Sequence, residues 1–168
     1  MTPLAPGAAT LPFTPATDRP PTVVAPAAGR PLRAFGNEIL FKLGAEQTGG
    51  ALSLGLATVP VASGGPPPHV HEGEDEILLV LEGRYRVWVE GVWSEAGPGS
   101  VVFLPRGMAH TFHVVGGEPG RHWVLTTSSA FERFFAGCAE LFAEPGPPDR
   151  ERLAAVAAAH GTTFQRPG

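Results

Sequence analysis

Two histidines one residue apart carry the clearest chemical signal in this chain. His69 and His71 follow three consecutive prolines, and acidic residues stand at positions 72, 74, 75 and 76. In an extended strand, side chains two residues apart project from the same face, so the two imidazole rings can converge on one point. Two imidazoles placed in this way predict bidentate binding of a divalent transition metal ion.

The acidic residues after His71 cannot be ranked by strand alternation alone. In an unbroken strand, Asp75 would share the face of His71, whereas Glu76 would project from the opposite face. Gly73 favours a turn or bulge here, and the next strand begins at Glu76 or just before it. The residue pattern therefore leaves Asp75 and Glu76 as alternatives for an acid that turns inward. The other interpretation is a solvated acidic loop, which would contain Glu72, Glu74 and Asp75.

A second pair of histidines lies in the segment 97–116, where a Pro–x–Gly turn separates two apolar runs. His110 opens the later run and shares its face with Phe112 and Val114, whereas His113 lies on the opposite face. These neighbours favour His110 as the histidine that faces the interior of a barrel. We expect His113 to be structural or exposed.

The remaining histidines and the single cysteine are expected to be structural. His122 lies in an apolar strand with no partner at ligand spacing, and His160 lies in a terminal helix. Cys138 falls on the apolar side of an expected helix, where a thiol usually behaves as a small core group.

The elements that must position these side chains are mainly short strands. From position 22 to position 127, apolar segments recur at close spacing with Gly or Pro between them and without a helical period. Such punctuation is typical of an all-β sandwich or barrel. The expected strands cover residues 22–26, 38–44, 51–61, 76–83, 85–91, 100–105, 110–116 and 122–127. We place the barrel at residues 23–128 and interpret residues 1–22, rich in Pro, Ala and Thr, as an N-terminal arm that is either disordered or packed on a partner subunit.

Two short α-helices are predicted after the barrel, in residues 129–168. Ser129 lies three residues before Glu132, which predicts a capping box, and the apolar residues between positions 131 and 142 recur at three- and four-residue spacing. A second helix follows Asp149, a suitable N-cap, and ends at Gly161. We expect both helices to pack against the barrel or a neighbouring subunit.

Composition and charge limit the partners and the cellular location expected for the protein. The chain has 168 residues, a net charge of −4 and a pI of about 5.8, so it lacks the basic surface typical of proteins that bind nucleic acid or anionic lipid. Its one cysteine cannot form an intramolecular disulfide, and it has no apolar run of about 18 residues that would span a membrane. The segment MTPLAPGAATLPFTP lacks the basic and apolar regions of a signal peptide. These features predict a cytoplasmic protein with neither a nucleic-acid nor a membrane partner.

Together, the two histidine segments resemble the two motifs of the cupin superfamily. The residues that match the first motif are His69, His71, Glu76 and Gly83, with Ser63 in place of the leading glycine. The residues that match the second motif are Gly99, Pro105, Gly107 and His110, with Val114 in place of the final asparagine. That asparagine is not a metal ligand in the family, so this difference leaves the expected site intact. The wider pattern, from position 46 to position 135, resembles bacterial single-domain cupins that are compared with quercetin dioxygenases.

The resemblance implies a cupin-type jelly-roll β-barrel that holds one divalent transition metal ion, which would be Fe, Mn, Ni, Co, Cu or Zn. The implied ligands are His69, His71, Glu76 and His110. Glu76 is thereby selected among the acids, and it would also serve as the catalytic general base, the role proposed in quercetinase-like relatives. The expected apolar substrate pocket is lined by Phe103, Phe112 and Val114, with Trp88 or Trp123 as further candidates.

Such a site predicts a metal-dependent dioxygenase of the quercetinase type that acts on a small, apolar or aromatic, enolisable substrate. Two alternatives stay open: a metal-dependent isomerase, lyase or decarboxylase on the same barrel, and a non-catalytic module that binds a small molecule or a metal. No basic cluster accompanies the histidines, which disfavours a sugar-phosphate isomerase. Because cupins are often dimers, we also expect a homodimer, with the N-terminal arm or the Phe-rich helix at its interface.

Overall fold

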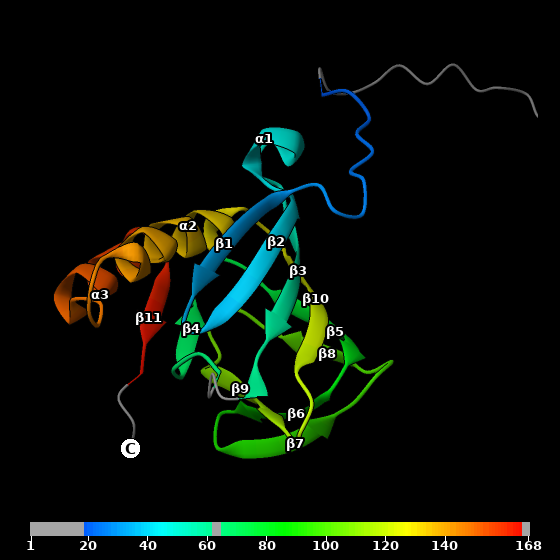
Figure 1. Ribbon diagram of the computed structural model, residues 1–168. Coiled ribbons are helices and arrows are strands. Elements are labelled where there is room, and N and C mark those ends of the chain that lie inside the picture. The colour runs from blue at the N-terminus through cyan, green and yellow to red at the C-terminus, as the bar shows by residue number, and fades with distance from the viewer. Residues whose placement is uncertain (1–18, 62–64, 166–168) are drawn as a thin grey trace, which may run out of the picture.

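Two antiparallel β-sheets and three helices are formed by residues 19–61 and 65–165, the part of the chain that this computed structural model describes (Figure 1). The first sheet contains, in spatial order, β1 (Arg30–Ala34), β2 (Asn37–Leu43), β3 (Ser53–Val59), β10 (Gly120–Thr126), β5 (Glu76–Glu82) and β8 (Val101–Leu104). The second sheet contains β11 (Thr162–Phe164), β4 (His69–His71), β9 (His110–Val115), β6 (Arg84–Val89) and β7 (Val92–Ala96). Several neighbouring strands, such as β3 with β10 and β11 with β4, come from distant parts of the sequence, as in a jelly roll, and the all-β prediction is confirmed.

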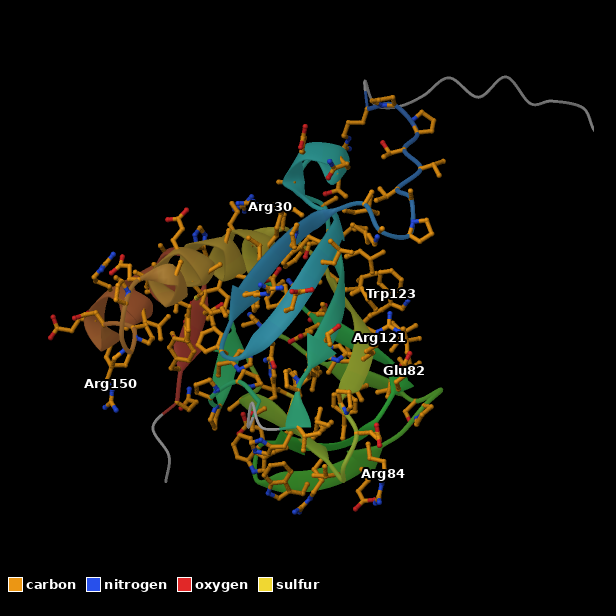
Figure 2. All side chains as sticks on the ribbon, viewed as in Figure 1. Arg30, Glu82, Arg84, Arg121, Trp123 and Arg150 are labelled. Atoms are coloured by element: carbon orange, nitrogen blue, oxygen red, sulfur yellow. The ribbon has the colours of Figure 1, made fainter. Side chains whose placement is uncertain are left out.

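Each sheet turns one face toward the core between the sheets. Buried and half-buried positions alternate along β3 and β10, and the buried set includes Ala57, Val59 and Val124. This alternation is expected for an antiparallel sheet with one face on the core. On the outer face of β10, Arg121 and Trp123 point away from the barrel (Figure 2), and Arg121 pairs with Glu82 at 2.6 Å. The inner face therefore provides the surroundings of any buried site.

The expected strand at residues 22–26 is not a strand in the structure. This segment is an irregular approach to β1, held by Lys42, whose Nζ donates hydrogen bonds to the carbonyl oxygens of Ala25, Pro26 and Ala28. Prolines at positions 20, 21 and 26 lack the amide hydrogens that a sheet requires, which explains the difference. Residues 1–18 of the expected N-terminal arm lie outside the described residues.

The C-terminal helices lie against one side of the barrel (Figure 1). They are α2 (Ala130–Ala143) and α3 (Arg150–Ala159), and a short helix that the sequence did not predict, α1 (Ala45–Thr48), follows β2. The predicted apolar stripe of α2 is buried, with the Phe131 ring 5.9 Å from the ring of Phe41 on β2. Burial also raises the pKa of the Cys138 thiol to about 12, as expected for a structural cysteine.

The predicted capping box of α2 is wrong, although the helix begins where expected. The Ser129 side chain does not cap the helix, and its Oγ instead accepts a hydrogen bond from Arg133. Glu132 Oε2 accepts a hydrogen bond from the backbone N–H of Ala45, so its carboxylate supports α1. In α3, by contrast, Asp149 Oδ1 accepts from the backbone N–H of Arg152 at 2.8 Å, which confirms the predicted N-cap.

No helix in the described part of the chain combines the length and apolarity needed to cross a membrane.

Candidate metal centre

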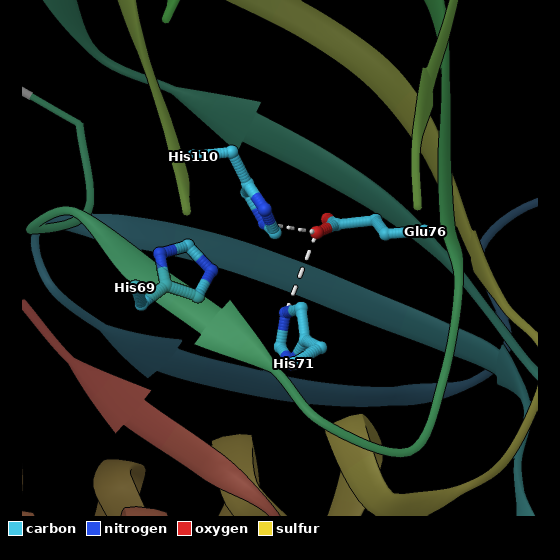
Figure 3. Close-up of side chains that lie close together, drawn as sticks. All are labelled: His69, His71, Glu76 and His110. Carbon is cyan, nitrogen blue, oxygen red and sulfur yellow. Dashed lines mark hydrogen bonds and ion pairs between the residues drawn. The ribbon is translucent and has the colours of Figure 1, made fainter. Parts of the chain in front are cut away.

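Four buried side chains from three strands meet between the two sheets. His69 and His71 project from the same face of β4, and His69 lies opposite His110, the first residue of β9. Glu76 is the first residue of β5, in the other sheet. Figure 3 shows the three imidazoles and the carboxylate pointing toward one another. The structure thus brings together the four residues that the cupin resemblance implied as ligands.

The ligand atoms of this cluster lie close enough to share one ion. One nitrogen or oxygen atom of each residue lies within 4.8 Å of the others, and all four residues are buried. Glu76 Oε2 is 3.2 Å from His110 Nε2 and 3.4 Å from His71 Nε2 (Figure 3). The ring centroids of His69 and His110 are 4.5 Å apart. An ion placed among these atoms needs little movement of any side chain.

The outer nitrogen of each ring has a fixed partner. Nδ1 of His69 lies 2.9 Å from the carbonyl oxygen of Pro67, and Nδ1 of His110 lies 2.9 Å from that of Met108. A carbonyl oxygen only accepts hydrogen bonds, so both Nδ1 atoms carry a proton. Nδ1 of His71 lies 3.2 Å from Thr162 Oγ1. With the proton on Nδ1, the neutral rings of His69 and His110 present an Nε2 lone pair to the centre of the cluster, as ligating histidines do.

This arrangement fits a divalent metal ion. Among the described residues, buried Nε2 of His71 has no hydrogen-bond partner, and a neutral His110 has no proton on Nε2 to share with the Glu76 carboxylate. Either a proton on His110 or a cation is therefore needed between these groups. Three imidazole nitrogens and one carboxylate suit Fe, Mn, Ni, Co, Cu or Zn in the divalent state and leave coordination positions for a further ligand.

Burial and proximity determine the charges of the cluster. Burial, with the nearby His71 and His110, lowers the pKa of His69 to about 3. For Glu76, burial alone would raise the pKa, but the hydrogen bond of His110, the close contact of His71 and the charges of both rings lower the pKa well below its usual value. Burial lowers the pKa of His110, but the hydrogen bond and charge of Glu76 outweigh burial and raise this pKa. Glu76 is therefore ionised at neutral pH, the state in which it can ligate a metal.

One acid that we expected in a solvated loop is buried beside the cluster. Glu74 is 2% exposed, and its Oε2 accepts a hydrogen bond of 2.6 Å from Ser128 Oγ, just before α2. Its Oε1 lies 3.8 Å from Nδ1 of His71. Burial raises the pKa of Glu74, against the opposing effect of the Ser128 hydrogen bond. The expectation of a solvated loop is thus wrong for Glu74, because the turn at residues 72–73 directs it back toward the start of α2.

Asp75 connects the two histidine segments. Its carboxylate accepts hydrogen bonds from the backbone N–H and the guanidinium of Arg106, each at 3.0 Å, and these lower the pKa of Asp75 to about 2. Arg106 belongs to the turn that precedes His110, so this pair joins the loop before Glu76 to the loop before His110. Glu72 is exposed, as expected.

An apolar cavity of about 50 Å³ adjoins His69 and Glu76. Its aromatic wall contains Phe35, Phe112, Phe131, Phe134, Phe135 and Phe164. The volume accommodates a few water molecules or a small ligand group, so a ring-sized ligand requires some of these side chains to turn. The structure thus places Phe112 in the wall, as the sequence suggested, and adds phenylalanines from α2.

Two other expected pocket residues do not line this cavity. Phe103 is 58% exposed on β8, where Leu104 is the buried residue, so the pocket assignment of Phe103 is wrong. Val114 is buried but stands outside the residues that line the cavity. Trp123 projects from the outer face of β10 (Figure 2), and Trp88 is also outside the cavity lining.

Sequence reasoning missed two polar residues of the cavity wall, Asn37 and His122. His122, Val124 and Thr126 occupy every second position of β10, and all three are buried on the same face. This period of two was a usable signal for an inward position, but a search for metal-ligand spacing does not detect it.

Comparison with known proteins supports a cupin fold for the central part of the chain. Residues 55–125 match the cupin domain family, a span that contains all four clustered residues. Solved structures of similar fold include a predicted oxalate decarboxylase from Thermotoga maritima, with 22% identity and a TM-score of 0.55 over 64% of this chain and 99% of that chain. Another is the polyketide cyclase RemF from Streptomyces resistomycificus, with 23% identity and a TM-score of 0.54 over 64% of this chain and 79% of that chain.

A third similar structure is the Cnp3 cupin domain of Schizosaccharomyces pombe, with 16% identity and a TM-score of 0.53 over 64% of this chain and 74% of that chain. No curated protein matches the chain. The protein therefore has a cupin jelly-roll fold with a buried cluster of three histidines and one glutamate that suits a metal ion. At these identities the similarity defines the fold and leaves the reaction to be argued from the site.

Proposed function

We propose that this protein is a metal-dependent dioxygenase that acts on a small, apolar or aromatic, enolisable substrate. The main support for this proposal is that Glu76 belongs both to the histidine cluster and to the wall of the aromatic cavity. Its Oε2 contacts His110 and His71, and the same side chain lines the aromatic cavity beside His69. A substrate in the cavity would therefore meet both the metal ligands and a carboxylate that can accept a proton.

The resident metal, when bound, would lower the pKa of the substrate enol and promote its reaction with dioxygen. The histidine contacts of Glu76 use Oε2, so Oε1 is the oxygen assigned to accept the enol proton. In the overall reaction both atoms of dioxygen enter the organic product as a carbon–carbon bond is cleaved. The substrate supplies the electrons that reduce dioxygen, and no separate reductant is required.

The lining of the cavity supports an uncharged, largely apolar substrate. Among the described residues that line it, none is Lys or Arg, the side chains that commonly bind phosphate or carboxylate groups. Phenylalanine rings instead form much of the wall. This composition argues against a phosphorylated sugar and favours a molecule with a planar, conjugated enol.

Oxygen uptake tests this proposal directly. Protein loaded separately with each of the six metals would be mixed with pentane-2,4-dione, benzoylacetone and 3-hydroxyflavone, a series of increasing size. We expect at least one metal to give one dioxygen consumed per substrate cleaved, and His113→Ala, a change outside the cavity, to preserve the rate. Substrate conversion without oxygen uptake would instead indicate a redox-neutral enzyme. Binding of metal and substrate without conversion would indicate a non-catalytic module.

A further inference from the structure

The aromatic cavity contains polar side chains that do not belong to the metal-binding cluster. His122 is 2% exposed on β10 and Asn37 is 7% exposed on β2, and both line the cavity. In the β5–β10 ladder, Glu76 pairs with Thr126. His122 lies four residues before Thr126 on β10 and pairs with Val80. That separation corresponds to about 13 Å along the strand. The His122 backbone is thus well removed from that of Glu76.

The position of His122 is well defined by the sheet. A shift in the β5–β10 register lies between Arg121 and His122, and Arg121 and Trp123 on either side point outward (Figure 2). His122 is therefore directed into the barrel, where its ring packs edge-on against Phe112, with centroids 5.4 Å apart. Burial lowers the pKa of His122 to about 4, so the imidazole is neutral at physiological pH.

Tyr85 selects one tautomer of this neutral ring. Its hydroxyl lies 2.9 Å from Nδ1 of His122, the single hydrogen-bond partner that the described residues give it. If the hydroxyl donates to Nδ1, the imidazole proton lies on Nε2. The reverse arrangement would leave the phenolic proton without an acceptor in the packed wall, because Tyr85 does not line the cavity. The favoured tautomer therefore places an N–H donor on the ring that faces the cavity.

Gly120 provides the space for this contact. A Cβ atom at position 120 would lie 2.2 Å from the Tyr85 hydroxyl oxygen, so any side chain there would displace the phenol. Tyr85 itself is 1% exposed. The Tyr85–His122 pair is thus fixed by packing on the side away from the cavity.

A second, independent observation indicates that the cavity is built for a ligand with hydrogen-bonding groups. Oδ1 of Asn37 is buried and has no hydrogen-bond partner among the described residues. A buried amide without a partner is costly to fold. Asn37 lines the same cavity as His122, so a ligand there can satisfy both side chains.

We propose that His122, oriented by Tyr85, forms a specificity subsite that donates a hydrogen bond from Nε2 to an oxygen acceptor of an uncharged aromatic ligand. The ligand would place one oxygen function at the metal centre and a carbonyl or similar acceptor at His122. The inference rests on the proposed function in that it assumes a ligand anchored at the metal. It adds a second recognition point, and Tyr85 acts as a positioning residue.

A matched pair of probes tests the subsite on zinc-loaded protein, which does not oxidise catechols. 4-Acetylcatechol can chelate the metal through its hydroxyl oxygens and offers a remote carbonyl, and 4-isopropenylcatechol has a similar shape without that acceptor. The measurement is the ratio of their dissociation constants by isothermal titration calorimetry. Comparing this ratio between variants cancels the intrinsic difference in chelation. We expect His122→Phe to reduce the preference for the acetyl probe by roughly tenfold, the loss of about one neutral hydrogen bond in an apolar site.

Control variants separate recognition from folding. Tyr85→Phe keeps the aromatic ring and should also reduce the preference, whereas His113→Phe, on the half-exposed side of β9, should leave it unchanged. An unchanged ratio in His122→Phe, with tight binding of both catechols, would overturn the subsite but not the metal site. Failure of both catechols to bind the wild-type zinc protein would overturn the subsite together with the proposed substrate site.

Nitrogen NMR of histidine-labelled zinc protein gives a readout that is independent of ligand and turnover. Nδ1 of His122 should resonate as an unprotonated, pyridine-type nitrogen and Nε2 as a protonated, pyrrole-type nitrogen. In Tyr85→Phe this preference should weaken or reverse. A proton on Nδ1 in the wild-type protein would contradict the proposed donor at Nε2, whatever the binding data show.

Discussion

Thr162 Oγ1 lies 3.2 Å from Nδ1 of His71, a contact between residues 91 positions apart in the sequence. It arises because β11, the last strand, pairs with β4 and places Thr162 opposite His71 in the ladder. The C-terminal extension therefore supports the ring of a candidate metal ligand. Outer partners of this kind fix the tautomer and orientation of ligating histidines.

Replacement of Thr162 by valine should weaken metal binding while preserving shape. We expect Thr162→Val to lower the affinity for zinc by about 10- to 100-fold, since Nδ1 of His71 loses its hydroxyl partner. Competition with a chromophoric chelator measures this change. The matched control is Thr163→Val, at the next position of the same short strand and not fully buried. Equal zinc affinities of Thr162→Val and Thr163→Val would show that Thr162 does not support the His71 ring.

Glu76→Gln tests the assigned proton acceptor. The amide keeps the size of the side chain and one oxygen that can ligate, so we expect bound metal at saturating concentration but a loss of turnover of at least roughly 100-fold. Metal content and oxygen uptake must be measured on the same preparation. Full turnover by a metal-loaded variant would rule out Glu76 as the base.

Acid should destabilise the metal-free protein through His122. Because burial lowers the folded-state pKa to about 4 from the ordinary 6.5, the unfolded chain binds a proton at higher pH than the folded one. The stability contributed by neutral His122 is therefore complete above about pH 6.5 and is lost as pH falls toward 4, by roughly 3 kcal/mol. Urea unfolding of wild type and His122→Gln at pH 7 and pH 4 should show this relative loss in the wild type. If the unfolding free energies of wild type and His122→Gln differed by the same amount at pH 7 and at pH 4, the predicted role of His122 would be contradicted.

Gly83, the glycine that matches the end of the first cupin motif, lies between β5 and β6 with a φ of +82°. A Cβ there would lie 2.8 Å from the Cα of Gly120 and from the carbonyl oxygen of Pro119. We expect Gly83→Ala to cost about 2–4 kcal/mol from backbone strain and crowding together. The matched control is Gly116→Ala, whose φ is +90° but whose Cβ would meet nothing within 4 Å, and which should cost about 1 kcal/mol. Denaturant unfolding of both variants measures the difference, and equal losses would contradict the crowding argument.

The barrel and its cluster of three histidines and one glutamate could be anticipated because their signals are local in the sequence. The spacing of His69 and His71 indicates a shared strand face, and the alternation after His110 places it inward with Phe112. The position of Glu76 did not follow from alternation, since the turn at Gly73 breaks the strand. Only the spacing of the whole motif selected it.

The remaining parts of the site depend on packing between distant segments. Glu74 is buried because Ser128, 54 residues later, hydrogen-bonds its carboxylate, and no local pattern indicates such a contact. Phe103 was misplaced because every residue of β8 is apolar, so alternation cannot identify the inner face. His122 was overlooked because no second histidine lies at ligand spacing from it in the sequence, although its two-residue spacing from the apolar Val124 was visible. The homodimer and the cytoplasmic location stay predictions.

We propose that His69, His71, Glu76 and His110 together hold one divalent metal ion. Elemental analysis of purified protein, before and after equilibration with zinc, tests it most directly when wild type is compared with His110→Ala and with His113→Ala on the same strand. We expect one metal per chain for wild type and His113→Ala, and a sharp loss of occupancy at limiting zinc for His110→Ala. Full occupancy in His110→Ala, or no metal in the wild type after equilibration, would contradict it.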